Sequence, residues 1–205
     1  MKGLCVAGIG TEVGKTVASA AICEALGWDY WKPVASGLAD GPGDGEIITS
    51  LIHNGSQRVH PSRYLFARSL SPHVASALEG VTIALDELQM PQSTRPIVVE
   101  LAGGVFVPLN DKDTNLDLIT SLKLPVVVVS RHYLGSINHT LLTLDALRNR
   151  GISVHGVIFN GEELPDTERI ICAMGRVEIR GRIPQLAEVS CASVHEVAKT
   201  LSVRL

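Results

Sequence analysis

The chain has 205 residues, of which 45% are hydrophobic and 19% charged, with a formal net charge of −3. A chain of this length and hydrophobic content can form one complete hydrophobic core, so we expect a single domain over residues 1–205. The mild negative charge argues against a nucleic-acid-binding surface, and no apolar run could span a bilayer. The N-terminus lacks the pattern of a signal peptide, so we expect a cytoplasmic protein. The four cysteines are scattered, which favours buried free thiols over disulfides or a zinc site.

Short apolar runs alternate with helical patterns along the chain. Residues 4–7 predict a first strand, and the alanine-rich residues 15–26 predict a first helix. Further strands are predicted over residues 28–31, 96–101, 124–130 and 154–160, and a helix over 137–151. Runs of β-branched residues without polar alternation are typical of strands buried on both faces. We therefore predict an α/β fold, in which helices cover both faces of a mostly parallel sheet.

Residues 8–16, GIGTEVGKT, follow the first predicted strand and open the first helix. A standard phosphate loop reads G-x-x-x-x-G-K-[ST], yet counting back from Gly14 places Ile9 where the first glycine belongs. The start of a helix presents unpaired N–H groups and a positive dipole end to a phosphate. Lys15 could then reach the β- and γ-phosphates, and the Thr16 hydroxyl could bind magnesium. A phosphate loop is indicated, with a glycine-rich turn as the alternative.

Polar or glycine residues follow four of the predicted strands, over residues 8–16, 32–37, 100–104 and 160–161. Ligands of open α/β sheets bind beyond the carboxyl ends of the strands, so we expect these segments to form one rim. Each segment taken alone could equally be a tight turn.

Magnesium requires hard oxygen ligands, usually one or two carboxylates beside phosphate and water. Glu100, at a predicted strand end, is one candidate. Asp44 is the second, in the glycine-rich segment 39–46 that we expect to be a loop, and Glu46 is its alternative. Lys32 is placed to reach a bound γ-phosphate, although it could also be an ordinary surface lysine.

Five motifs together resemble the dethiobiotin synthetase family. They are GIGTEVGKT (8–16), KPVASG (32–37), SPH (71–73), AGG after Glu100, and GSINHTLLT (135–143). They occur in the family's order, and the similarity extends from about residue 8 to about residue 186. The family's loop, G-x-x-x-x-x-G-K-T, starts at Gly8 and accounts for the unusual spacing. Two positions depart from the family: many members carry an acidic residue at Gly10, and a glycine is common at Leu101.

The resemblance implies a single-domain P-loop NTPase-like fold and an ATP-dependent ring closure. One amine of 7,8-diaminononanoate would take up CO2, supplied as CO2/bicarbonate, to form a carbamate. ATP would phosphorylate the carbamate, and the second amine would attack the carbamic-phosphoric anhydride to give dethiobiotin. The implied cofactor is Mg2+, with ATP as co-substrate, and the implied assembly is a homodimer with shared active sites. Neither nucleic acid nor a membrane is an implied partner.

The resemblance also implies roles for individual residues. The catalytic residues would be Lys15, Lys32 and Thr11, and the metal ligands Thr16, Asp44 and Glu100. The nucleotide would be bound by Thr11, Glu12, Val13, Gly14, Lys15, Thr16, Asp44, Glu100, Leu101, Ala102, Gly103, Asn160, Gly161, Pro184, Gln185 and Leu186. The substrate would be bound by Thr11, Lys32, Ser36, Gly135, Ser136, Ile137 and Asn138. Asn138 and His139 have an alternative as helix-capping or interface residues.

Two other functional classes share a phosphate loop of this kind. One is a P-loop ATPase switch of the partitioning or positioning type, whose loops generally carry an extra lysine at the place of Gly10. The other is an ATP-dependent amide-forming domain, which usually carries a glutaminase domain as well. We expect ATP turnover that depends on diamine and bicarbonate to distinguish the ring-closing enzyme from both.

Overall fold

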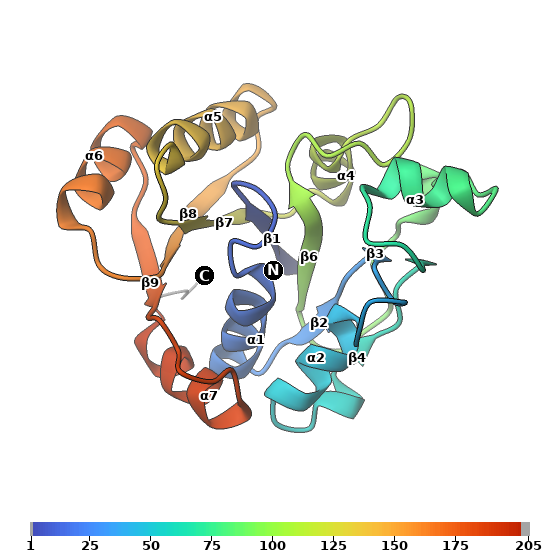
Figure 1. Ribbon diagram of the computed structural model, residues 1–205, viewed down its shortest axis with the longest axis horizontal. Helices are drawn as coiled ribbons and strands as arrows, with labels where there is room; N and C mark the ends of the chain where they lie inside the picture. The colour runs from blue at the N-terminus through green and yellow to red at the C-terminus, as the bar shows by residue number, and fades with distance from the viewer. Residues whose placement is uncertain (1, 202–205) are drawn as a thin grey trace.

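The computed structural model describes residues 2–201, and its centre is a seven-stranded sheet (Figure 1). The strand order is β4 (Val59–His60), β2 (Asp29–Trp31), β6 (Ile97–Gly104), β1 (Gly3–Gly8), β7 (Val126–Arg131), β8 (Val154–Asn160) and β9 (Ile179–Ile183). Neighbouring strands are parallel throughout. A second, two-stranded parallel sheet pairs β3 (Val34–Ser36) with β5 (Tyr64–Phe66). The predicted mostly parallel sheet is confirmed.

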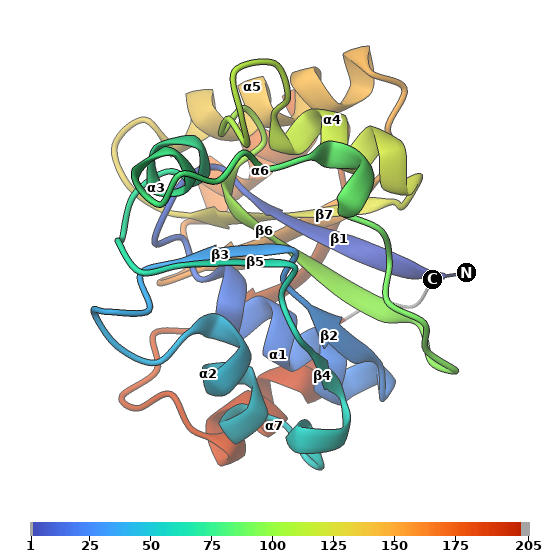
Figure 2. The same cartoon turned by 90° about the vertical axis from the view of Figure 1, so that its right-hand side faces the viewer.

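Helices cover both faces of the large sheet, as Figure 2 shows. One face carries α1 (Lys15–Leu26), α2 (Asp44–Leu51) and α7 (Cys191–Thr200). The other carries α3 (Pro72–Leu78), α4 (Asn115–Leu122), α5 (Ser136–Asn149) and α6 (Pro165–Gly175). Two short 3-10 turns, η1 (Gly55–Gln57) and η2 (Leu85–Glu87), lie in the connections. Among residues 2–201, no helix is both long enough and apolar enough to cross a membrane.

The two hydrophobic cores lie on opposite sides of the sheet, because alternate residues of each strand point to opposite faces. In β7, Val126 and Val128 belong to one core, and Val127 and Val129 belong to the other. All four valines are fully buried, which explains why this strand shows no polar alternation. All four cysteines are free thiols; Cys5 and Cys23 are buried as expected, whereas Cys172 and Cys191 are only partly buried.

Two predicted segments differ from the structure in their local form. Residues 39–46 were expected to be a loop, but the loop ends at Gly43 and Asp44 begins α2. Residues 34–36 were expected at the rim, in a segment that follows the strand over 28–31, and they form a further strand, β3, that pairs with β5. Both differences arise from long-range contacts, the pairing of β3 with β5 and the packing of α2 against α1, which no local sequence pattern indicates. The start of α2 fixes Asp44 on a rigid element rather than on a flexible loop.

Candidate active site

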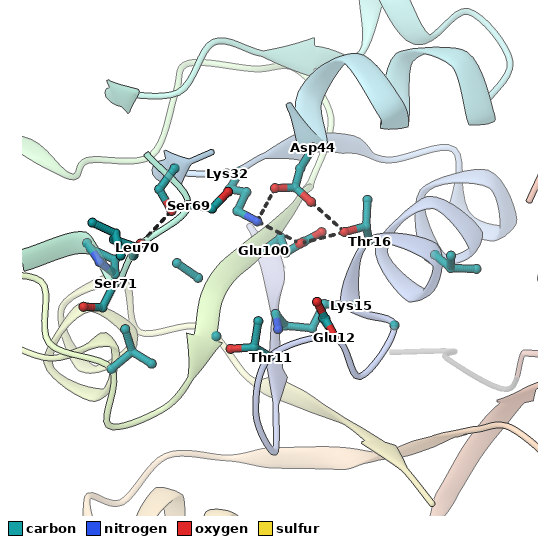
Figure 3. A pocket seen from close by; sticks show the side chains of 17 residues that line it. Thr11, Glu12, Lys15, Thr16, Lys32, Asp44, Ser69, Leu70, Ser71 and Glu100 are labelled. Carbon is teal, nitrogen blue, oxygen red and sulfur yellow. Dashed lines mark hydrogen bonds and ion pairs between the residues drawn. The ribbon is translucent and has the colours of Figure 1, made fainter. Parts of the chain in front are cut away.

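A cleft of about 830 Å³ opens at the carboxyl ends of β1, β2 and β6 (Figure 3). Three of the four predicted rim segments contribute to it. The expected site residues that line it are Thr11, Glu12, Gly14, Lys15, Thr16, Lys32, Ser36, Asp44, Glu100, Ala102 and Gly103. Parallel strands place their carboxyl ends on one edge, so residues far apart in the chain meet there.

The loop between β1 and α1 is held in one conformation by its neighbours. Gly14 has φ 92°, in the left-handed region, and a Cβ atom there would lie 2.3 Å from Nδ2 of Asn160. Asn160 Nδ2 donates a hydrogen bond to the Val13 carbonyl oxygen at 2.9 Å. Lys15 Nζ donates to the Gly10 carbonyl oxygen at 2.9 Å. The loop therefore leads into the N-terminus of α1, where unpaired N–H groups can receive a phosphate.

Lys32, Asp44, Glu100 and Thr16 form one network of hydrogen bonds and ion pairs (Figure 3). Lys32 Nζ lies 2.5 Å from Asp44 Oδ2 and 3.2 Å from Glu100 Oε1. The Thr16 hydroxyl lies 2.7 Å from Asp44 Oδ1 and 3.2 Å from Glu100 Oε1. Two carboxylates and a hydroxyl thus converge beside the start of α1. Glu46, the alternative to Asp44, is not among the residues that line the cleft.

Burial and charge shift the pKa values of this network in opposite directions. Burial alone would lower the pKa of Lys32, but the charges of Glu100 and Asp44 outweigh it and raise that pKa. For Lys15 burial prevails, helped by the nearby positive charge of Lys32, and its pKa is lowered. Burial would raise the pKa of Asp44, yet the Lys32 ammonium lowers it. The opposite charges of Lys32 and Asp44 therefore offset the effect of burial on each other's pKa values.

Glu100 is fixed by partners that sequence reasoning missed. Its side chain is 1% exposed, and the Tyr30 hydroxyl donates to Oε2 at 3.1 Å. Asn115 Nδ2 donates to the carbonyl oxygens of Ala102 and Gly104 at 2.7 and 2.9 Å, which holds the end of β6. Tyr30 lies in the predicted strand over residues 28–31, but nothing in the sequence indicates which carboxylate it meets.

The remaining expected residues lie outside the cleft. The side chains of Val13 and Leu101 are buried in the two cores, so Leu101 faces away from the cleft. Asn160 is the last residue of β8 and Gly161 follows it. Both lie beside the segment 184–186 that follows β9, because the Gly161 N–H donates to the Ile183 carbonyl oxygen at 2.9 Å. Gly135, Ser136, Ile137 and Asn138, at the start of α5, do not line the cleft of their own chain.

A wall of the cleft comes from residues that were not expected as site residues: Ser69, Leu70, Ser71, Pro72 and Val107. The motif SPH, residues 71–73, was the one sequence feature that could have indicated these residues. Ser36 Oγ donates to the Leu70 carbonyl oxygen at 2.9 Å and connects β3 to it. The cleft thus has a phosphate-loop side and a separate serine-rich side.

Comparison with known proteins places this geometry in a family. Residues 2–193 match the family model described as an AAA domain. The ATP-dependent dethiobiotin synthetases of Brucella ovis and Brucella abortus are each 45% identical over 192 residues, which cover 94% of this chain and 90% of theirs. The chain belongs to the dethiobiotin synthetase family. The predicted resemblance is thereby confirmed.

More distant structures share the P-loop NTPase fold with this dethiobiotin synthetase family member. A ParA family ATPase from Chlorobium tepidum superposes with a TM-score of 0.57 at 14% identity, covering 99% of this chain and 92% of that one. The cell division ATPase MinD of Pyrococcus furiosus gives 0.56 at 12% identity, with 97% and 98% covered. At such identities the likeness concerns the fold alone, and the predicted fold class is confirmed.

Proposed function

We propose that this chain catalyses the ATP-dependent closure of the ureido ring that converts 7,8-diaminononanoate and CO2 to dethiobiotin. Family membership supports the overall reaction. The observation that carries the proposal is the Lys32 ammonium held between Asp44 and Glu100, the two carboxylates that also contact Thr16 at the start of α1. A buried cation beside a phosphate-binding helix terminus suits a reaction between two anions, the ATP γ-phosphate and a carbamate.

The oxygen atoms in the network fit a magnesium site. Thr16, Asp44 and Glu100 supply one hydroxyl and two carboxylates, the hard ligands that Mg2+ prefers. These three residues would hold the ion, which when bound would neutralise charge on the β- and γ-phosphates. Asp44 is favoured over Glu46 because the Asp44 carboxylate already contacts the Thr16 hydroxyl.

The residues of this chain would act mainly by positioning and by charge. The first amine of the diamine adds to CO2 and loses a proton, giving a carbamate. Lys15 binds the ATP phosphates, and Lys32 brings the carbamate oxygen toward the γ-phosphorus while ADP leaves. Thr11 and Ser36 orient the diamine. The second amine then attacks the carbonyl carbon of the anhydride and loses a proton, and inorganic phosphate departs as the ring closes.

The expected site residues that lie outside the cleft would bind the adenine base of ATP and the carboxylate tail of the diamine. Asn160, Gly161 and the segment 184–186 lie together at the ends of β8 and β9 and would contact the adenine. The segment 135–138 would bind the substrate carboxylate across a homodimer interface, because it does not line the cleft of its own chain. We further propose a cytoplasmic location and a single domain over residues 1–205.

The test is ATP turnover with and without substrate. Purified protein with ATP, Mg2+, bicarbonate and 7,8-diaminononanoate should release one phosphate for each dethiobiotin detected by mass spectrometry. Omission of the diamine should abolish most phosphate release. Turnover that is independent of the diamine, with no ring product, would instead favour the ATPase switch.

A further inference from the structure

A cluster of two histidines and one glutamate lies on the α1, α2 and α7 face of the sheet. Its members are Glu24 in α1, His53 in the connection after α2, and His195 in α7. One ligand atom from each lies within 4.8 Å of the others. None of the three lines the cleft described above. The helices α1, α2 and α7 pack against one another, and His53 lies two residues beyond the end of α2.

The three side chains converge on a single oxygen atom. Glu24 Oε1 lies 2.5 Å from His53 Nδ1 and 3.3 Å from His195 Nδ1. The two imidazole rings meet edge to face, with centroids 5.7 Å apart. Around a tetrahedral ion with bonds of 2.0–2.1 Å, ligand atoms lie about 3.4 Å apart. Small side-chain rotations would bring the two nitrogens and Oε1 to that separation.

The second carboxylate oxygen of Glu24, Oε2, has separate partners that fix its position. Oε2 accepts a hydrogen bond from the His53 backbone N–H at 3.1 Å and lies 3.8 Å from Arg58 Nη1. The same Arg58 nitrogen donates to the His53 carbonyl oxygen at 3.1 Å. Arg58 is therefore a positioning residue that orients both Glu24 and the His53 backbone. Such outer contacts are what fix a metal-binding carboxylate in place.

The cluster is also open to solvent from the histidine side. The side chains of His53 and His195 are 64% and 46% exposed, whereas that of Glu24 is 10% exposed. Both histidines line a second cleft of about 890 Å³. An ion could thus enter between the rings, with the carboxylate at the floor of the site and room for a water molecule.

We propose that Glu24, His53 and His195 form a transition-metal site, best suited to Zn2+. Two imidazoles and one carboxylate are a donor set that zinc accepts with water in the fourth position. Magnesium would bind poorly, because imidazole nitrogen is a softer ligand than the oxygens it requires. The ion would connect α1, the segment after α2, and α7.

The experiment uses the full chain, stripped with a chelator and desalted, in the absence of nucleotide. Zinc is titrated calorimetrically, and bound metal is measured by mass spectrometry after desalting. We expect one zinc ion per chain, an affinity reduced at least about tenfold in His53→Gln and His195→Gln, and a similar loss in Glu24→Gln. Zinc should also raise the melting temperature of the wild type but not that of His53→Gln.

Two control variants separate this site from other zinc ligands. Glu188→Gln removes a carboxylate from the same cleft, and Asp44→Asn disables the proposed magnesium site; both should keep the zinc affinity. His53 is largely exposed, so its variant should fold even if Glu24→Gln does not, as circular dichroism can verify. Absence of zinc binding would overturn the proposal. Unchanged affinity in His53→Gln, or loss in either control, would overturn it too.

Discussion

The ammonium nitrogen of Lys32 lies 2.5 Å from Oδ2 of Asp44, which joins the segment after β2 to the first residue of α2. The contact fixes a cation in the cleft that Lys15 also lines. The two lysines differ in their present partners, since Lys15 donates to a loop carbonyl whereas Lys32 is bound by two carboxylates. This difference suggests separate tasks in phosphoryl transfer.

We expect Lys15→Gln to weaken ATP binding and turnover together, and Lys32→Gln to lower kcat by about 100-fold with a much smaller effect on ATP affinity. Only an interaction that strengthens in the transition state raises the rate of the chemical step. Calorimetric ATP affinity and steady-state kcat would be measured for both variants. Equal losses of ATP affinity, without a selective fall in kcat for Lys32→Gln, would contradict this division of roles.

Gly14 should be far less tolerant of a side chain than Gly10. Gly14 has φ 92°, and its added Cβ would lie 2.3 Å from Asn160 Nδ2, while a Cβ at Gly10 meets nothing within 4 Å. We expect Gly14→Ala to reduce the free energy of unfolding by about 1–3 kcal/mol, through backbone strain and the displaced Asn160. Gly10→Ala is the matched control and should be nearly neutral in urea unfolding. Similar costs in the two variants would refute the steric argument.

Asp117 should contribute stability that depends on pH. Partial burial opposes its charge, but hydrogen bonds from Arg150 and Thr114 lower the pKa of Asp117 from 3.8 to about 2. Because the folded-state pKa is the lower one, the contribution is complete above about pH 4 and is lost as the pH falls from 3.8 toward 2.

We expect Asp117→Asn to lower the free energy of unfolding by about 1 kcal/mol at pH 7, allowing for solvent screening of this partly exposed group. The difference from wild type should shrink between pH 4 and pH 3 in urea unfolding. Asp145→Asn, at an exposed position in α5, serves as the control. A difference that stays constant down to pH 3 would argue against the ion pair as its source.

Shared active sites can be tested by complementation. Asn138→Ala would disable the proposed tail site, and Lys15→Gln would disable the phosphate site. If each site borrows residues 135–138 from its partner, a mixed dimer has one site with both defects and one with neither. Activity should then rise above either parent, toward about half of wild type per mixed dimer. Subunit exchange without any recovery would assign the segment to its own chain's site.

The sequence predicted the fold class and a candidate phosphate loop because both leave signals in neighbouring residues. β-branched runs such as residues 126–129 predict buried strands, and a glycine-rich segment between a strand and a helix predicts an exposed helix N-terminus. It also supplied the candidates Lys32, Asp44 and Glu100. It could not choose between Asp44 and Glu46, because that choice depends on how α2 packs beside α1.

What the sequence by itself determined is therefore the α/β fold class, a candidate phosphate loop before the first helix, and the family. Only the tertiary structure decided which distant side chains meet. Thr16 contacts carboxylates 28 and 84 residues away, and Glu24 meets a histidine 171 residues away. The physical reason is that periodicity and capping act over a few residues, whereas strand order and helix packing are set by the burial of the whole core. Such long-range contacts follow from the arrangement β4-β2-β6-β1-β7-β8-β9, which no local pattern specifies.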